Sequence, residues 1–428
     1  MSNPLRSELA QDTRPHLLFL CQTLPFPPDG GAHIRSYHLL RLLSREYRVT
    51  ALHFYRRATR PTPEHVRSGL DGLKDIAEVE AYPIPQEFSR IRWYWDHIRS
   101  VLARRAYTVF TYESRDFARR VRALLSTNEF SLVHVDSLDL AYYLPLLEEV
   151  PMVCGHHNIE SALLERRAEV QQDPVSRVYM RLQSRFTRAE ERRWAPKVSL
   201  NITCSPVDSD VLTTLAPNAG VTSIPNGVDT RGFPPSFSGM EGIVFVGGYS
   251  WFPNADGMRW FAEDILPLIR HQAPHLPVTW VGRMPAPTGK EFEDRFGITV
   301  TGYVDDIRPY VHRAACMIVP LRVGGGTRLK ILDGWSLGSA IVSSSVGCEG
   351  LDARHDQNIL IADSSEEFAQ AVLQVVSDAE LRERLGRAGR ETAETVYDWA
   401  VIGDRLLKEY RDLRAASGLP KSSTPGGR

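Results

Sequence analysis

A glycine-rich loop followed by two cations is the segment of the sequence best suited to chemistry. Residues 320–333 read PLRVGGGTRLKILD and follow an apolar run typical of a buried strand, with helical periodicity from about Thr327. Glycines before a helix leave backbone N–H groups free of side chains, so Gly325, Gly326 and Thr327 could cradle phosphate oxygens. The pattern GxxxxGK[ST] is missing, which makes ATP hydrolysis a poor interpretation.

Arg328 and Lys330 place two positive charges at the start of the predicted helix. A cation there normally costs up to about 1 kcal/mol, because the helix dipole favours an anion. The placement becomes favourable when a bound diphosphate supplies negative charge. Asp333 could accept hydrogen bonds from ribose hydroxyls, and Glu349 follows another strand at the same sheet edge. The alternative is a glycine loop with solvated basic residues.

Two further loops follow predicted strands. Segment 25–33, PFPPDGGAH, joins the first strand to a helix, and Gly30 and Gly31 would let the backbone approach an anion or a sugar. Segment 154–160, CGHHNIE, places His157 at the end of a buried strand, where parallel-sheet proteins meet substrate. The alternatives are a plain strand-to-helix turn and a structural histidine. Side chains of adjacent histidines diverge, so we predict no metal site.

Short apolar runs alternate with amphipathic stretches along the whole chain and position these loops. Continuous apolar strands separated by helices are typical of parallel sheets covered on both faces, and the arrangement occurs twice. We therefore predict an α/β fold with two Rossmann-like, doubly wound parallel-sheet domains facing a central cleft. The predicted strands are 16–21, 47–55, 79–83, 132–136, 151–155, 200–204, 243–247, 277–282, 298–301, 316–320, 340–344 and 358–361.

The predicted domain boundary lies at the segment 224–229, IPNGVD, because Pro followed by Asn-Gly is strong turn chemistry. The prediction is an N-terminal domain over 1–222 and a C-terminal domain over 223–395. A last helix lies within 396–416, and the polar tail 417–428 is predicted to be disordered.

The bulk composition is that of an ordinary globular protein. Hydrophobic residues make up 43% and charged residues 24%, and the formal net charge is −1, so no positive field indicates nucleic acid as the partner. The five cysteines are scattered without metal-ligand spacing, which suits a reducing cytosol. We see no signal sequence and no apolar stretch near the roughly 20 residues that span a bilayer. We expect a cytoplasmic protein, or one peripheral at the inner face of the membrane.

With these residues in view, the chain resembles the GT-B glycosyltransferases of retaining family 4 (glycosyl transferases group 1). The string 324–333, then Gly338, then SSSVGCEGL at 343–351, resembles the pattern G-G-T-R-L-K-I-L-E…G…V-S-T…G-x-E-G-L of a family subgroup. The segment 224–229 resembles the family's hinge. The similarity covers nearly the whole chain and is most specific in the second half.

Three shorter segments extend the resemblance. FVGG at 245–248, which contains Gly247, resembles the opening of the donor domain. TGYVDD at 301–306 resembles a loop whose backbone, here at Tyr303 and Val304, reads the nucleotide base in relatives. His157 and its neighbour Asn158 match the H-N pair that faces the sugar.

The resemblance implies a division of labour. The C-terminal domain would bind a UDP- or GDP-linked sugar as co-substrate, and the N-terminal domain would bind a hydroxyl acceptor on a glycan, a lipid carrier or a small glycoside. Arg328 and Lys330 would hold the diphosphate and Asp333 the ribose. Transfer would retain anomeric configuration and need no metal, and no cofactor would stay bound. The last helix would cross back to brace the first domain.

Three positions depart from the family pattern. The first carboxylate of the broad family's E-x7-E falls at Gly325, and the second is Asp333, one methylene shorter than glutamate. The cations often found after the first donor-domain strand are replaced by Gly248 and residues without an obvious charge. These changes place more of the phosphate binding on Arg328 and Lys330.

Segment 88–105, FSRIRWYWDHIRSVLARR, mixes five arginines with Trp93, Tyr94 and Trp95. A basic, aromatic, amphipathic segment can lie on an anionic membrane surface, where lipid-linked acceptors reside. The alternative is a helix whose tryptophans pack on a core and whose arginines are solvated.

Two other functions stay open at this point. A nucleotide-sugar 2-epimerase shares the two-sheet cleft and would convert a donor without any acceptor. A catalytically silent nucleotide-sugar-binding subunit of a polysaccharide assembly system would bind nucleotide without turnover. A nicotinamide dehydrogenase is disfavoured, because neither half carries the glycine fingerprint with its acidic partner.

Overall fold

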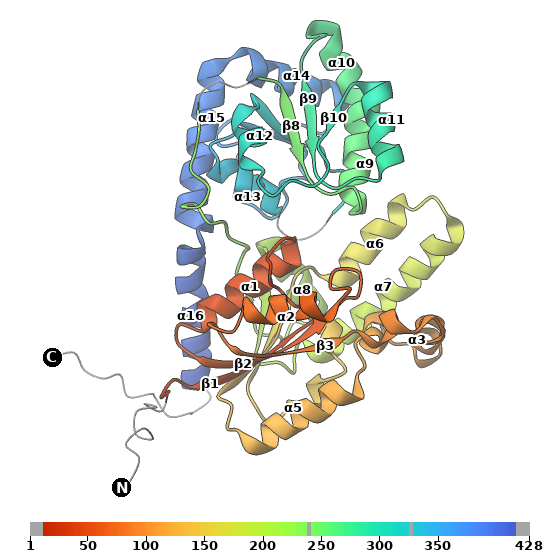
Figure 1. The fold of residues 1–428 in the computed structure, drawn as a ribbon, viewed down its shortest axis with the longest axis vertical. Helices are drawn as coiled ribbons and strands as arrows, with labels where there is room; N and C mark the ends of the chain where they lie inside the picture. Colours follow the sequence, from red (N-terminus) through yellow and green to blue (C-terminus); the bar gives the residue numbers. More distant parts are fainter. Residues whose placement is uncertain (1–11, 238–240, 325–327, 417–428) are drawn as a thin grey trace, which may run out of the picture.

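The first half of the chain builds a parallel sheet covered on both faces (Figure 1). The computed structural model describes residues 12–237, 241–324 and 328–416. In the first of these ranges the strand order is β3-β2-β1-β4-β5-β6-β7, and each pair of neighbouring strands is parallel. The strands are β1 (His16–Cys21), β2 (Arg48–Tyr55), β3 (Glu78–Pro83), β4 (Leu132–Val135), β5 (Met152–His156), β6 (Leu200–Thr203) and β7 (Val221–Ser223).

Alternate residues of β1 pack into two different hydrophobic cores, one on each face of the sheet. The sequence of this strand is continuously apolar because both of its faces are buried. Leu17 and Phe19 pack on one face, and Leu18 and Leu20 pack on the other.

The helices of the first half cover the two faces of this sheet. They are α1 (Gly31–Leu43), α2 (Pro63–Asp71), α3 (Arg90–Ala103), α4 (Tyr107–Thr111), α5 (Arg115–Thr127), α6 (Glu160–Val170), α7 (Pro174–Trp194) and α8 (Pro206–Leu215), with the short 3₁₀ helices η2 (Pro85–Phe88), η3 (Leu138–Leu140) and η4 (Leu144–Leu146).

The second half repeats the architecture with the strand order β10-β9-β8-β11-β12-β13, again parallel throughout the described pairs. The strands are β8 (Ile243–Val246), β9 (Val278–Val281), β10 (Thr299–Val300), β11 (Cys316–Val319), β12 (Ile341–Ser343) and β13 (Leu360–Ile361). The helices are α9 (Phe252–Trp260), η5 (Phe261–Ile265), α10 (Leu266–Gln272), α11 (Ala286–Phe296), α12 (Arg308–Arg313), α13 (Leu329–Ser336), α14 (Ser365–Ser377), α15 (Ala379–Thr392) and η6 (Ala393–Tyr397).

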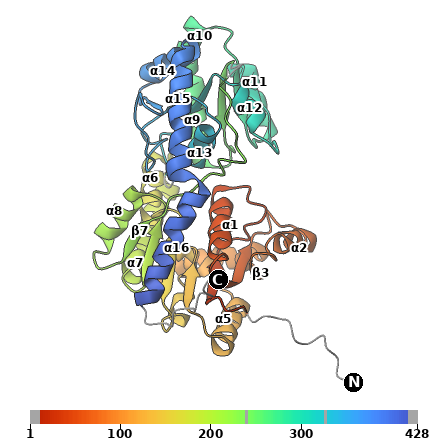
Figure 2. The same cartoon turned by 90° about the vertical axis from the view of Figure 1, so that its left-hand side faces the viewer.

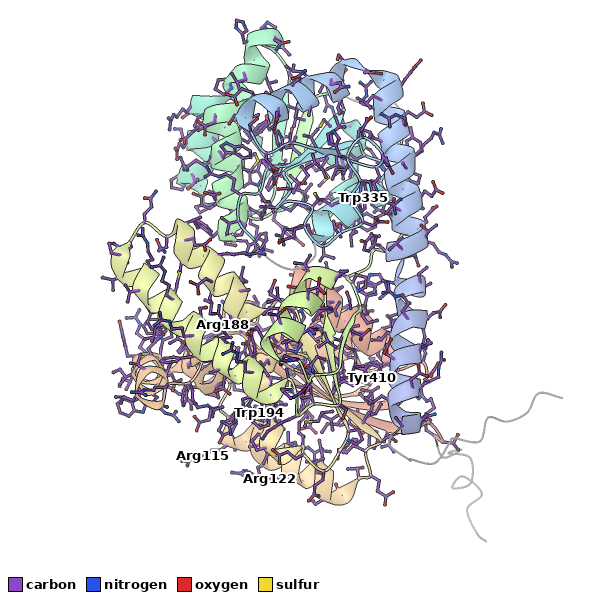
Figure 3. The ribbon with its side chains drawn as sticks, turned by 180° about the vertical axis from the view of Figure 1, so that it is seen from behind. Arg115, Arg122, Arg188, Trp194, Trp335 and Tyr410 are labelled. Atoms are coloured by element: carbon purple, nitrogen blue, oxygen red, sulfur yellow. The ribbon has the colours of Figure 1, made fainter. Side chains whose placement is uncertain are left out.

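The last helix, α16 (Trp399–Ala416), runs down the side of the first domain, as Figures 1 and 2 show. Its residues Ile402, Leu406 and Tyr410 are buried in the same core as Leu17 and Phe19 of β1. The Tyr410 hydroxyl lies 2.5 Å from Nδ1 of His134 on β4. Figure 3 labels Tyr410 beside the first sheet and Trp335 of α13 beneath the second. The chain thus returns to its first domain after completing the second.

These observations confirm the predicted fold of two doubly wound parallel sheets. All twelve predicted strands are present, with ends shifted by at most two residues. The prediction omitted β7, which has only three residues, none of them fully buried, and so lacks an apolar run. The predicted disordered tail, 417–428, lies outside the described residues. No helix in the described part of the chain is both long and apolar enough to cross a membrane.

Strand order reverses between β1 and β4 in the first sheet and between β8 and β11 in the second. Loops that leave the carboxyl ends on either side of such a reversal diverge and open a crevice for ligands. The loops after β1 and β4 lead to Gly30 and Asp136, and those after β8 and β11 lead to Gly247 and Arg328. The fold thereby places Gly30, Asp136, Gly247 and Arg328 beside these two crevices.

Candidate functional site

A cavity of about 480 Å³ lies between the two domains and is lined from both. The first domain contributes the start of α1 and the loop after β5, and the second contributes the loop after β8 and the start of α13. The lining residues are Gly30, Gly31, Ala32, His157, Asn158, Asn226, Gly248, Ser250, Trp251, Arg328, Leu329 and Lys330. The cavity therefore gathers residues from all three loops that the sequence indicated.

Lys330 brings a half-buried amine to the cavity wall. Its Nζ donates a hydrogen bond to Oδ1 of Asn254 over 2.6 Å and lies 4.1 Å from the centroid of the Phe245 ring. Among the described residues it forms no ion pair with a carboxylate. Burial, and secondarily the charge of Arg328, holds the pKa of Lys330 well below its usual range. An anion in the cavity would therefore favour the charged form of Lys330 strongly.

Arg328 occupies the N-cap position of α13 and is only 3% exposed. Its Nη2 donates to the carbonyl of Val346 over 3.3 Å, and its guanidinium carbon lies 6.0 Å from the centroid of the Trp251 ring. Burial lowers the pKa of Arg328 to about 10, which still leaves it charged near pH 7. Two cations and a helix N-terminus consequently face one cavity, an arrangement that suits a diphosphate.

Asn254 on α9 fixes the position of Lys330. Its Nδ2 donates to the carbonyl of Gly248 over 2.8 Å, while its Oδ1 accepts from Lys330. A Cβ atom at Gly247 would lie 2.6 Å from Nδ2 of Asn254 and 2.9 Å from Nζ of Lys330. The glycine thus leaves the space that the Asn254–Lys330 hydrogen bond occupies.

We expect Gly247→Ala to weaken nucleotide binding by about tenfold or more, because the new methyl group would push Asn254 and Lys330 apart. The φ angle of Gly247 is 156°, so any other residue at this position would also strain the backbone. Titration calorimetry with nucleoside diphosphates would measure the loss. Gly289→Ala on α11 is the matched control, since a Cβ there would meet no atom closer than 3.7 Å and Gly289 is not among the residues that line the cavity. Equal affinities for the two variants would contradict the prediction.

His157 lines the cavity from the first domain, and buried Asp136 orients its ring. The Nε2 atom of His157 lies 3.2 Å from Oδ2 of Asp136, which also accepts from the Ser36 hydroxyl over 2.5 Å. On the other side, Nε2 of His134 lies 3.4 Å from Oδ1. Burial opposes ionisation of Asp136, yet the two histidines hold its pKa well below its usual range. With Nε2 directed at this carboxylate, Nδ1 is the ring nitrogen left to accept a further hydrogen bond.

The first loop brings a second helix N-terminus to the cavity. Gly30 is the N-cap of α1 and Gly31 its first residue. A Cβ atom at Gly30 would meet nothing within 4 Å, and one at Gly31 would lie 3.5 Å from Cδ1 of Leu329 on α13. The two helices thus begin close together across the domain boundary, and both present N–H groups to the same space.

Other residues singled out in the sequence lie outside the cavity lining. Tyr303 is exposed, with the Arg283 guanidinium carbon 4.3 Å from its ring centroid, and Val304 follows it in the same loop. Asp333 is half-buried on α13, and burial raises its pKa to about 7. Gly325, Gly326 and Thr327 lie outside the described residues.

The half-buried carboxyl of Asp333 predicts a specific pH dependence of stability. The pKa of Asp333 is about 7 in the folded protein against a usual value of 3.8. The stability that the folded protein gains from holding this proton is therefore present at low pH and is lost as pH rises through about 7. The asparagine of Asp333→Asn does not titrate. The unfolding free energy of this variant minus that of the native protein should therefore rise by up to about 2 kcal/mol from pH 5 to pH 8. Urea unfolding at both pH values measures this gain. A difference that does not change with pH would contradict the prediction.

Glu349 makes a contact between the domains. Both of its carboxylate oxygens accept from Arg166 on α6, over 2.6 and 3.0 Å. Arg166 also donates to the carbonyl of Gly324 over 2.9 Å. The first domain therefore contacts Gly324 of the second domain, and Glu349 fixes the Arg166 side chain that makes this contact.

The sequence reasoning did not single out Asp136, Arg166 or Trp251. Asp136 directly follows β4 at the reversal of strand order, which is the signal that could have found it. Arg166 and its partner Glu349 are 183 residues apart, so no local pattern marks the pair. In the described ranges no three His, Cys, Asp or Glu side chains are grouped as a metal site.

With this geometry in place, comparison with known families defines the class. The profile of Glycosyltransferase Family 4 matches residues 29–231, and that of Glycosyl transferases group 1 matches residues 241–378. The two matched regions contain the loops that line the cavity from each domain. The chain belongs to the glycosyltransferases of family 4, group 1, and the resemblance seen in the sequence is confirmed.

Solved structures agree on the fold. A sucrose-phosphate synthase from Thermosynechococcus elongatus superposes with a TM-score of 0.66 at 17% identity, covering 94% of this chain and 100% of that one. Anabaena HepE in complex with UDP-glucose gives a TM-score of 0.64 at 14% identity, covering 93% and 100%.

A sequence relative, described as an uncharacterised 44.6 kDa protein in the cps region of Klebsiella pneumoniae, is 24% identical over 139 residues. The match spans 31% of this chain and 36% of the relative.

Proposed function

We propose that this glycosyltransferase moves a sugar from a nucleoside-diphosphate sugar to a hydroxyl acceptor with retention of anomeric configuration and without a metal ion. The observation that carries the proposal is the pair formed by buried Arg328 and half-buried Lys330 at the start of α13, in the cavity between the domains. Two desolvated positive charges at a helix N-terminus match the charge of a diphosphate. HepE, which shares the fold, has been solved with UDP-glucose, and this supports a UDP-linked donor.

The proposed reaction breaks the bond between the anomeric carbon and the oxygen of the β-phosphate. Arg328 and Lys330 stabilise the negative charge that develops on the leaving diphosphate. The acceptor oxygen forms the new bond on the same face of the sugar, and its proton passes to a leaving phosphate oxygen. The cationic pair supplies the charge stabilisation that a metal ion supplies in other enzymes.

His157 is proposed to hold the transferred sugar. Its ring is fixed by Asp136 and lies in the same cavity as Arg328 and Lys330. A hydrogen bond from a sugar hydroxyl to Nδ1 would orient the anomeric carbon toward the acceptor, which reaches the cavity from the first domain. Because Gly325 stands where the broad family has a carboxylate, we assign His157 a larger share of sugar binding than it has in relatives.

The acceptor is proposed to be a carbohydrate. The Klebsiella relative is described as lying in a cps region, which supports a role in polysaccharide assembly. The acceptor hydroxyl would belong to a growing glycan, a lipid-linked sugar or a small glycoside.

The test is a product analysis with UDP- and GDP-linked sugars in the presence and absence of a carbohydrate acceptor mixture, read by NMR. We expect consumption of one donor, acceptor-dependent appearance of a glycoside, and the anomeric configuration of the donor in that product. An epimerised nucleotide sugar formed without acceptor would replace this proposal with the epimerase function. Nucleotide binding without turnover under any condition would support the silent subunit.

A further inference from the structure

Helix α3 has its polar residues inside and its apolar residues outside. Asp96 is fully buried and lies 3.4 Å from both Arg92 and Arg99. Ser100 is also buried, and it donates to the carbonyl of Arg105 over 2.7 Å and accepts from Gln183 of α7 over 2.8 Å. The face of α3 that meets the domain is therefore held by charges and hydrogen bonds, which is the reverse of an ordinary surface helix.

The opposite face of α3 is an exposed apolar stripe. Ile91 is 84% exposed, Trp95 54%, Ile98 49% and Leu102 74%, and their spacing places them on one side of the helix. We call this set, together with exposed Val175 and Val178 on α7, the α3–α7 patch. The two helices are in contact, because Nδ1 of His97 on α3 lies 2.5 Å from the Tyr179 hydroxyl on α7. Figure 1 shows both helices at the same edge of the first domain.

The patch is bordered by positive charge. Arg90 and Arg104 are exposed at the two ends of α3, and Arg181 and Arg185 are exposed on α7 beyond the valines. The single acidic residue of α3, Asp96, is buried. The chain as a whole carries a formal charge of −1, so this concentration of exposed arginine is local.

We propose that the α3–α7 patch docks on an anionic membrane surface. A tryptophan among aliphatic side chains, bordered by arginine, matches the boundary between lipid headgroups and acyl chains. The arginines would meet acidic headgroups as the apolar stripe inserts. A two-fold dimer through the same patch would instead bring arginine against arginine. The proposal does not rest on the proposed transfer reaction, because it concerns binding to lipid alone.

The experiment is sedimentation of the full chain with vesicles, without any substrate. We expect binding to phosphatidylcholine vesicles that contain phosphatidylglycerol, weaker binding as salt rises, and little binding to phosphatidylcholine alone. The variant Ile91→Gln/Leu102→Gln should lower the partition coefficient at least about tenfold. Arg90→Gln/Arg104→Gln should lower it by roughly fivefold for each charge and reduce its salt dependence.

The matched control is Leu268→Gln, which removes an exposed apolar side chain from α10 in the other domain. It should bind vesicles like the native chain. Because Ile91 and Leu102 are exposed, their replacement should also leave the melting temperature unchanged. The proposal is overturned if the native chain ignores anionic vesicles, or if the Ile91→Gln/Leu102→Gln variant and the control bind equally. Concentration-dependent dimerisation that this variant abolishes, without vesicle binding, would assign the patch to a second copy.

Discussion

Replacing Arg328 with alanine will lower kcat/KM for sugar transfer by about 10²–10³-fold. Losing a preorganised charge that stabilises a leaving group costs this much in enzymes where single donors have been removed. Arg328 is buried at the start of α13 and remains charged near pH 7, so its full charge is directed at the cavity. Steady-state kinetics with the preferred donor would measure the loss.

Arg322→Ala is the matched control for this prediction. Arg322 precedes the same glycine-rich loop, but its side chain is half exposed and pairs with Asp256 over 2.7 Å. We expect less than about a threefold effect on kcat/KM, because exposed ion pairs contribute little. A second readout guards against misfolding: the melting temperature of Arg328→Ala should not fall by much, because the substitution also removes a buried charge. Similar activities of the two variants would show that Arg328 does not act in catalysis.

Replacing Lys330 with methionine will abolish measurable nucleotide binding while preserving the fold. Methionine keeps most of the apolar stem that lies beside Phe245 but removes the desolvated charge. The ligand-free variant should unfold cooperatively near the midpoint of the native chain, because burial already disfavours the charged form of the amine there. Thermal unfolding without ligand and calorimetry with nucleoside diphosphates are the two measurements. A variant that is destabilised, or that binds as well as the native chain, would contradict the assignment.

The same residue predicts how affinity depends on pH. Burial lowers the pKa of Lys330 in the free protein, and a bound diphosphate should raise it again. Binding should therefore take up a proton, and affinity should fall as pH rises through the depressed pKa of the free protein. Calorimetry in buffers of different ionisation enthalpy would detect this proton, which should be missing in Lys330→Met.

The fold could be predicted because its signals are local. Strands such as β1 and β11 are buried on both faces, so their sequences are continuously apolar and stand out between amphipathic helices. The strand β7 escaped notice because an edge strand of three half-buried residues has no such pattern. The glycines at 30 and 31 were found because turn chemistry at a helix start is also local.

The site could be predicted only in part, because its remaining contacts join distant segments. The hydrogen bond from Lys330 to Asn254 spans 76 residues, and the one between His157 and Asp136 depends on adjacent strands β4 and β5. Nothing in the local sequence of α3 indicates that Asp96 faces inward and Leu102 outward. Contacts outside the helix set that orientation, because Arg92 and Arg99 donate to Glu113 and Ser100 accepts from Gln183.

The measurement that tests the central claim most directly is thermal unfolding of the native chain and of Arg328→Ala with UDP, GDP, dTDP, ADP, NAD and ATP. A ligand at ~100 times its dissociation constant adds roughly 2.7 kcal/mol, which raises the midpoint clearly. The proposed donor site predicts that one of the nucleoside diphosphates UDP, GDP, dTDP and ADP raises the midpoint of the native chain and that Arg328→Ala abolishes the rise. A rise with NAD or ATP but with no such diphosphate, or a rise that survives in Arg328→Ala, would contradict it.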